Sequence, residues 1–241
     1  DHRLRLRSSQ IPAFVTALSG ALEGQAPSGD QHGKWIAAIA KDLKANPGKS
    51  IVLAGPNQPP AVHALVFAIN QSLGNIGQTI SFTKPVYDTT NSGVAALKSL
   101  VDEINAGTVK KLVILGGNPA YTAPYDLHLG DAIKKVGSTI FVGADVNETA
   151  VLAQWTVPEA HYLESWGDAA AVDGTASIQQ PLIQPLWGGK TQLEIVALLT
   201  GYKDQTSYDI VANYWKTRLG GSDAKKAWEK SLNDGVIATP K

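Results

Sequence analysis

Acidic residues and a histidine gather in one segment of the chain. They are Glu159, His161, Glu164, Asp168 and Asp173. Such side chains are metal ligands in many proteins, but their spacing matches no metal-binding motif, and H-E-x-x-H is absent. Carboxylates also accept hydrogen bonds from backbone N–H groups and so fix the course of a loop. We expect this structural use, and we assign no metal ligand and no catalytic residue.

Two glycine turns are candidates for binding an anion. The candidate cleft residues are Gly55, Asn57, His63, Gly116, Gly117 and Asn118. Glycine lets backbone N–H groups approach a phosphate closely, and a following helix adds partial positive charge. However, neither turn matches G-x-G-x-x-G or G-x-x-x-x-G-K-[ST]. Pro56 and Pro119 also lack an N–H to donate. We therefore favour plain tight turns over phosphate sites.

His63 is expected in the first turn of the helix that follows Gly55. A histidine near a cleft can act as a general acid or base. Local spacing places no acid or nucleophile beside it, and the G-x-S-x-G nucleophile motif is absent. We expect it to bond to a loop rather than to take part in chemistry.

Composition excludes several classes of protein. The 241 residues include 21 basic and 21 acidic side chains, so no basic field indicates nucleic acid or anionic lipid as a partner. The chain has no cysteine and therefore holds no thiolate zinc site or iron–sulfur cluster of its own. No apolar run reaches the roughly 18 residues of a membrane helix. The chain contains no methionine and begins with Asp1, so we expect an excised domain, a processed product or an incomplete sequence.

Strands are expected to alternate with helices, which predicts a mainly parallel sheet covered on both faces. The expected strands are Ile51–Ala54, Thr79–Phe82, Leu112–Leu115, Thr139–Val142 and Trp155–Val157. We predict an α/β, Rossmann-like three-layer sandwich with a five-stranded sheet in the order 2-1-3-4-5. The turns at Gly55 and Gly116 would then meet at the switch point, where open α/β sheets bind ligands.

Apolar residues at helical spacing predict the helices. The expected helical segments are 11–22, 35–43, 62–73, 94–104, 126–136, 147–153, 193–199, 208–219 and 223–232. Arg3–Arg7 alternates like a half-exposed strand. Residues 160–185 show neither period and predict a long ordered loop. We expect its Tyr162 and Trp166, with nearby Trp187, to cover apolar surface either on their own domain or on a neighbour. We expect one α/β domain over residues 1–201 and a helical extension over 202–241.

Three stretches together resemble the molybdopterin oxidoreductase superfamily. They are Val52–Ala64 with Leu73–Gly77, Leu112–Pro124, and His161–Pro185. Within this superfamily, the sequence resembles the molybdopterin-enzyme-like part of the iron–sulfur B subunit of alternative complex III, a membrane assembly that oxidises quinol. The resemblance runs from Asp1 to about Gly201.

The resemblance implies a non-catalytic scaffold domain on the extracytoplasmic face of the membrane. In catalytic relatives such a domain binds one pterin dinucleotide, whereas the resemblance to the complex III subunit implies that the molybdenum cofactor has been lost. Their iron–sulfur clusters lie in a ferredoxin-like region that this chain lacks. Other domains and subunits of the complex would be its partners, without direct membrane insertion.

Three functions therefore stay open. The first is a scaffold domain of a respiratory electron-transfer subunit, with no cofactor bound by this fragment and an exposed aromatic patch near Trp166 or Trp187. The second is a pterin-dinucleotide-binding domain of a molybdenum oxidoreductase. The third is an independent nucleotide-dependent enzyme with titrating groups in its cleft. Fold similarity alone does not choose among them.

Overall fold

The computed structural model describes residues 2–26, 32–83, 85–86, 90–221 and 223–237. The chain divides into two compact units, residues 1–82 and 83–241, here called the N-terminal and C-terminal units. The predicted boundary between residues 201 and 202 is a different division and stays a prediction. Within the described residues, every helix is too short or too polar to cross a bilayer.

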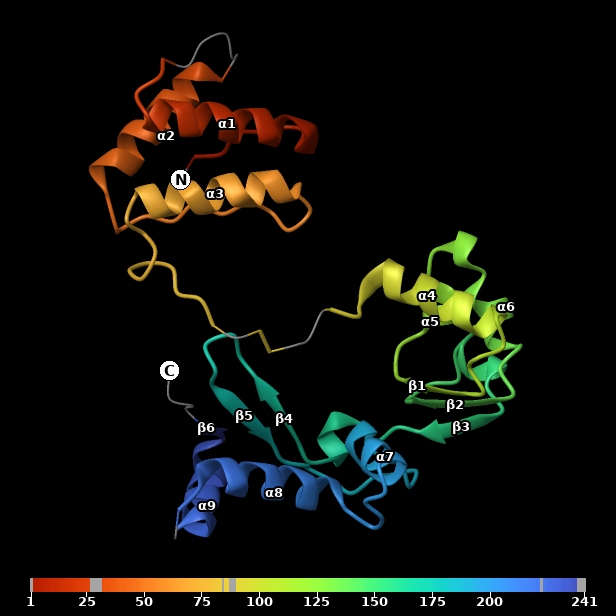
Figure 1. Cartoon of the computed structure of the whole chain (residues 1–241). Helices are drawn as coiled ribbons and strands as arrows, with labels where there is room; N and C mark the ends of the chain where they lie inside the picture. The colour runs from red at the N-terminus through yellow and green to blue at the C-terminus, as the bar shows by residue number, and fades with distance from the viewer. Residues whose placement is uncertain (1, 27–31, 84, 87–89, 222, 238–241) are drawn as a thin grey trace. The chain divides into compact units, whose positions relative to one another are not determined.

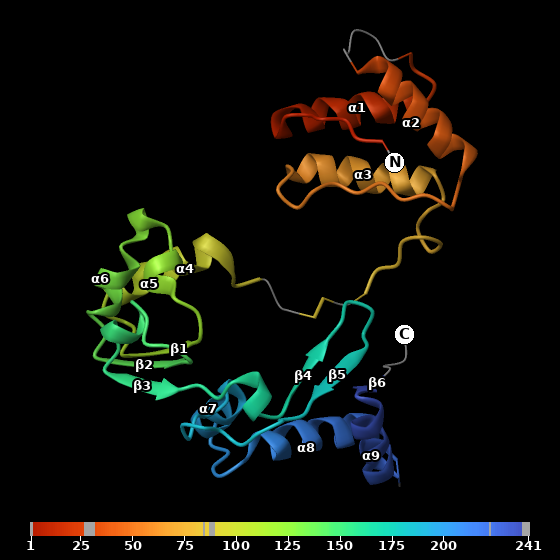
Figure 2. The same ribbon diagram turned by 180° about the vertical axis from the view of Figure 1, so that it is seen from behind.

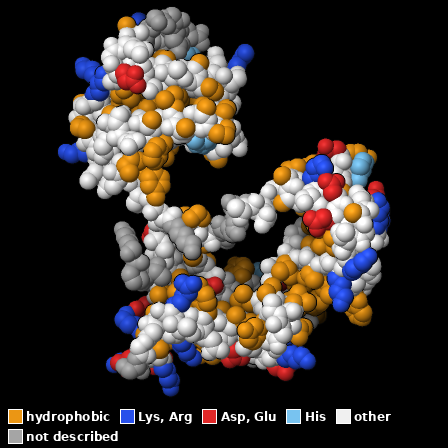
Figure 3. Space-filling model, in the orientation of Figure 1, with side chains coloured by type: hydrophobic (Ala, Val, Ile, Leu, Met, Phe, Trp, Pro, Cys, Tyr) orange, Lys and Arg blue, Asp and Glu red, His pale blue; other side chains and the backbone are white. Residues whose placement is uncertain are grey.

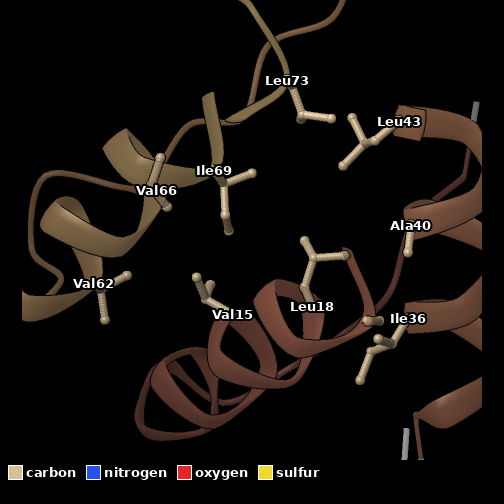
Figure 4. Close-up of a cluster of buried hydrophobic side chains, with 10 residues drawn as sticks. Val15, Leu18, Ile36, Ala40, Leu43, Val62, Val66, Ile69 and Leu73 are labelled. Atoms are coloured by element: carbon tan, nitrogen blue, oxygen red, sulfur yellow. The ribbon is translucent and has the colours of Figure 1, made fainter. Parts of the chain in front are cut away.

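Three helices form the core of the N-terminal unit. After a short 3-10 turn, η1 (Ser8–Gln10), come α1 (Ile11–Leu22), α2 (Gly33–Ala45) and α3 (Pro60–Ser72). Their apolar positions recur at helical spacing, so each helix turns one stripe toward the others. Figure 4 shows Leu18 of α1, Ile36 of α2 and Ile69 of α3 pointing into this common core, and all three are almost fully buried. The predicted helices here are confirmed.

The segment Ile51–Ala54 is not a strand of a sheet, contrary to the prediction. It runs alongside α3, as Figures 1 and 2 both show. The side chain of Asn70 explains this course. Its Oδ1 accepts from the N–H of Val52 at 3.0 Å, and its Nδ2 donates to the carbonyl of the same residue at 2.7 Å. One buried amide thus replaces a neighbouring strand on that side.

The predictions of strands at Thr79–Phe82 and Arg3–Arg7 are also wrong. Among the described residues near the first segment, the bridge pairing is limited to an isolated bridge between Ile76 and Ile80. There the backbone N–H groups of Thr79 and Ile80 donate to the carbonyl of Asn75, which folds the chain into a local turn. Turn hydrogen bonds have therefore taken the place of a sheet ladder.

The first part of the C-terminal unit contains a parallel sheet. Its strands β1 (Lys111–Leu115), β2 (Ser138–Gly143) and β3 (Trp155–Pro158) pair in that order. The elements around them are α4 (Gly93–Asn105), α5 (Pro119–Thr122), η2 (Tyr125–Leu127), α6 (Leu129–Ile133) and η3 (Ala150–Leu152). α4 and α6 pack together through a buried cluster that includes Ile104 and Ile133. The third, fourth and fifth of the predicted strands are thus confirmed, and they are neighbours in the predicted order.

A separate antiparallel sheet lies in the remainder of this unit. Its strands β4 (Gly167–Ala170), β5 (Ala176–Gln179) and β6 (Val236–Ile237) pair in that order. The 3-10 turn η4 (Tyr162–Glu164) and the helices α7 (Gln192–Leu199), α8 (Ser207–Leu219) and α9 (Ala224–Asp234) accompany it. Trp215 and Trp228 from the last two helices are buried against the sheet. The prediction that residues 160–185 form only a loop is therefore wrong.

The fold is α/β with two small sheets, so the prediction of one five-stranded Rossmann-like sheet in the order 2-1-3-4-5 is wrong. Short apolar runs predict burial but do not specify which strand pairs with which. Ile51–Ala54 buries Val52 and Ala54 partly against the three-helix core while Asn70 binds its backbone. The β4–β5 pairing needed no apolar run, because its residues are mainly small.

Candidate functional site

The carboxyl ends of β1, β2 and β3 meet at one edge, because the strands are parallel. Leu115, Gly143 and Pro158 are the last residues of these strands. Three connections follow at that edge: the turn beginning at Gly116, the turn that leads to Glu148, and the chain at Glu159. This edge, which we call the sheet edge, contains the second of the two predicted glycine turns.

Gly116 and Gly117 both adopt positive φ angles, of 67° and 71°. The N–H of Gly116 donates to the carbonyl of Val142 at 2.7 Å, which extends the sheet pairing by one bond. A Cβ on Gly116 would lie 3.1 Å from Nε2 of Gln192 and 3.8 Å from Oε2 of Glu159. Glycine is therefore favoured here by the backbone conformation and by the close approach of Gln192, whereas Glu159 lies at an ordinary contact distance.

Asn118 ties the glycine turn to the turn after β2. Its Nδ2 donates to Oε2 of Glu148 at 2.5 Å, and its Oδ1 accepts from the hydroxyl of Thr149 at 2.8 Å. Thr149 is fully buried and its hydroxyl in turn accepts from the N–H of Ala120. Asn147 adds a bond from its Nδ2 to the carbonyl of Gly117 at 3.1 Å. These polar groups bond to one another in a network that extends from the buried Thr149 to the exposed Glu148.

Two carboxylates flank the glycine turn. The hydrogen bond from Asn118 lowers the pKa of Glu148 below its ordinary value, so this side chain is ionised at neutral pH. On the other side, Oε1 of Glu159 accepts from Nε2 of Gln192 at 2.7 Å. Sequence analysis missed Glu148 and Gln192, because both come from segments distant in sequence from Gly116.

These residues do not fit the pyrophosphate of a pterin dinucleotide. A phosphate site at a glycine turn uses free N–H donors and the partial positive charge of a helix. Here the N–H of Gly116 is occupied by Val142, and the helix that follows, α5, has only four residues. The carboxylates of Glu148 and Glu159 would repel the phosphates. The arrangement is suited to holding two loops together.

The other predicted cleft residues lie in the N-terminal unit. Asn57 does not cap α3, because Pro59 occupies the cap position and Pro60 the first helical position. Gly55 has no other atom within 4 Å of an added Cβ. His63 is exposed in the first turn of α3, and its side chain makes no hydrogen bond within the described residues. Since the predicted five-stranded sheet does not form, the prediction that the Gly55 and Gly116 turns meet at its switch point is wrong.

The acidic residues of the segment 159–173 hold structure together, as expected. Glu164 accepts from the N–H groups of His161 at 3.1 Å and of Leu186 at 3.3 Å. Asp168 accepts from the indole N–H of Trp215 at 2.6 Å. Asp173 accepts from the N–H of Thr175 in the β4–β5 connection. In the described part of the chain, no three His, Asp or Glu side chains are arranged to hold a metal ion.

The aromatic residues of the same region divide into two kinds. Trp166 is half-buried and packs edge-on against Tyr208, with ring centroids 5.0 Å apart. Tyr162 and Trp187 are instead exposed, Trp187 at 85%. Tyr162 and Trp187 therefore do not cover apolar surface of their own unit, and that they cover a neighbour's surface stays a prediction.

Comparison with known proteins gives one partial similarity. No family model matches the chain. It is 31% identical over 90 residues to the assimilatory nitrate reductase catalytic subunit of Bacillus subtilis (strain 168). The match covers 36% of this chain and 12% of that protein, so the chain spans a small part of its curated relative. This similarity supports a relation to the molybdopterin oxidoreductase superfamily that the three sequence stretches resemble.

Proposed function

We propose that this chain is a non-catalytic scaffold module of an electron-transfer subunit related to the molybdopterin oxidoreductases. It binds no cofactor itself and docks neighbouring domains or subunits. The subunit proposed is the iron–sulfur B subunit of alternative complex III, on the extracytoplasmic face of the membrane. The family part of this proposal is supported by the partial similarity to a nitrate reductase catalytic subunit.

The observation that carries the scaffold role is an ordered loop with exposed apolar side chains. We call Leu182, Leu186 and Trp187 the proline-loop surface, since Pro181 and Pro185 interrupt the same loop. The three side chains are 77%, 67% and 85% exposed. Contiguous exposed apolar surface marks sites of protein contact, and three large exposed apolar side chains in one short loop favour such a site.

Hydrogen bonds hold this loop in shape from both ends. The N–H of Leu182 donates to the carbonyl of Leu163 at 2.8 Å, and the N–H of Leu186 donates to Glu164. At the far end the N–H of Lys190 donates to the carbonyl of Pro158 at 2.9 Å. A preformed loop loses little conformational entropy on binding, which favours a permanent docking role.

A calorimetric titration tests the absence of nucleotide binding. Guanosine diphosphate, the nucleotide half of the pterin dinucleotide, is titrated into the whole chain. We expect no saturable heat at millimolar nucleotide, because Glu148 and Glu159 repel the diphosphate. Saturable binding with a micromolar dissociation constant would overturn the scaffold proposal.

The partial similarity itself favours a second candidate, a domain that binds a pterin dinucleotide. The matched relative is a catalytic subunit, and the resemblance to the superfamily implies that catalytic members bind such a cofactor. This function requires the Gly116 turn to contact the diphosphate. The variant Gly116→Ala would then weaken nucleotide binding, whereas Gly188→Ala, at another positive-φ glycine, would leave it unchanged.

A further inference from the structure

A histidine side chain caps the short turn η4, to which the loop with the proline-loop surface is bonded. His161 stands at the start of this turn, and its Nδ1 accepts from the N–H of Leu163 at 3.3 Å. Glu164 completes the cap, because its Oε2 accepts from the N–H of His161 at 3.1 Å. These reciprocal bonds form a capping box in which an imidazole takes the place of the usual hydroxyl. The cap therefore depends on a nitrogen atom that can gain a proton.

Only the neutral imidazole ring can make this bond. A neutral ring donates from one nitrogen and accepts at the other, whereas the imidazolium ion carries N–H donors at both positions. Protonation of His161 would place its Nδ1–H against the N–H of Leu163, and the bond would be lost. Histidine is also the side chain whose charge ordinarily changes between about pH 5 and 8.

The turn carries bonds that hold the loop. The carbonyl of Leu163 accepts from the N–H groups of Leu182 and Ile183 at 2.8 Å and 3.3 Å. Oε1 of Glu164 accepts from the N–H of Leu186 at 3.3 Å. The two oxygens of this carboxylate thus bond to the cap and to the loop at the same time. A change in the cap therefore reaches the loop through Leu163 and Glu164.

The charged and titratable groups around the turn come from several segments. They are Tyr162 and Glu164 on the turn, Glu159 before it, and Lys190, Glu194 and Tyr208 in the segments that line the same cavity as Glu164. The segment 176–187, to which the turn is bonded, contains no charged residue. Figure 3 shows acidic and basic side chains interspersed on the visible face of the C-terminal unit. We therefore expect the groups close to the ring, rather than a field of one sign, to act on its charge.

Glu164 is the carboxylate that an imidazolium ion at His161 would attract most directly. Lys190 and Glu194 already lie 4.0 Å apart and offset each other. Glu164 is instead bonded to the backbone of His161 itself. A protonated ring would be drawn toward this carboxylate and would compete with the N–H of Leu186 for it. Protonation would therefore weaken the loop's attachment in addition to opening the cap.

We propose that His161 makes the proline-loop surface sensitive to pH. With a neutral ring, the cap holds η4 and the loop keeps its shape. With a protonated ring, the cap opens and the loop becomes mobile. Because an ordered loop loses less conformational entropy on binding, docking through this surface weakens as the pH falls below about 6. The inference rests on the proposed scaffold role, since it concerns the regulation of that same surface.

NMR relaxation at several pH values tests this switch in the whole chain. The backbone amide order parameters of Leu186 and Trp187 are measured between about pH 7.5 and about pH 5.5. We expect them to fall from about 0.85 to about 0.6 or less. The amide of Leu163 should shift with the same midpoint as the ring protons of His161. Order parameters that stay constant, or a ring that does not titrate in this range, would overturn the proposal.

Two replacements of histidine by asparagine separate the cap from other effects of pH. His161→Asn keeps a capping acceptor that does not titrate, and we expect its loop to stay ordered throughout the range. His128→Asn removes another histidine of the same unit, at a φ of 48° that asparagine tolerates. This control should keep the response of the unmodified chain. A loop that still loosens at low pH in His161→Asn would refute the role of His161.

The switch and the scaffold role are tested separately. Nucleotide binding together with a pH-dependent loop would remove only the scaffold role. A loop whose order does not change with pH, in a chain that binds no nucleotide, would remove only the switch.

Discussion

At the scale of single residues, two asparagine side chains hold loops in place by hydrogen bonds. Asn70 bonds a backbone that was predicted to pair in a sheet, and Asn118 bonds two turns that were predicted to contact a ligand. Asn70 is 2% exposed, and its amide bonds the backbone of Val52, the carbonyl of Val66 and the side chain of Asn75. Asn118 similarly joins two turns at the sheet edge. In a sequence, asparagine predicts a turn. The distant residues to which its side chain bonds are visible only in the structure.

The substitution Asn70→Ala is expected to destabilise the protein by about 2–4 kcal/mol, because it leaves several buried donors and acceptors without partners. Urea unfolding monitored by circular dichroism measures the loss. Gln71→Ala is the matched control, since the neighbouring side chain on α3 is exposed, and a change within about 0.5 kcal/mol is expected there. Equal effects of the two substitutions would show that the Asn70 network is not a source of stability.

The variant Glu148→Gln is expected to lower stability at neutral pH only. The bond from Asn118 lowers the pKa of Glu148 in the folded state. Its contribution is therefore complete above the pKa of an unfolded glutamate and is lost as pH falls through the lower folded value. Denaturant unfolding of both proteins at about pH 7 and about pH 3 measures the difference. A gap that persists at the lower pH would contradict this assignment.

At the scale of elements, apolar periodicity predicted the helices well and the strands only in part. Seven helices form near their expected positions, namely α1, α2, α3, α4, α7, α8 and α9. One apolar stripe along the sequence is enough to predict a helix, whatever element it packs against. A strand needs a neighbour, and the runs at Ile51 and Thr79 do not specify one. The β4–β5 hairpin was missed although Asp173-Gly174, a common turn pair, lies between its strands.

Capping fixes where α8 begins. The hydroxyl of Thr206 accepts from the N–H of Asp209, whose carboxylate accepts in return from the N–H of Thr206. We expect Thr206→Ala to cost about 1 kcal/mol in the free energy of unfolding. Thr217→Ala removes a bond to the carbonyl of Asn213 within the same helix, and this control should cost less because such a bond adds little to a helix. Equal costs in urea unfolding would contradict the capping role.

At the scale of the whole molecule, the chain combines exposed apolar side chains on its proline-loop surface with a sheet edge where its own polar side chains bond to one another. The sequence placed Gly116, Gly117 and Asn118 in a turn after a strand, which is confirmed. It did not indicate that the side chains of Glu148, Glu159 and Gln192 would lie beside that turn. The residues that contact one another there are about 30 positions or more apart in the chain. The polar environment of the sheet edge was therefore visible only in the structure. Its carboxylates and its side-chain hydrogen bonds support the proposed scaffold role.

Pterin analysis of the freshly purified chain tests the central claim most directly. The protein is isolated from its source without denaturant, and any pterin is released, oxidised and measured by its fluorescence against the protein concentration. The scaffold account predicts no pterin fluorescence above that of a buffer blank. A pterin dinucleotide recovered in nearly equimolar amount would contradict it.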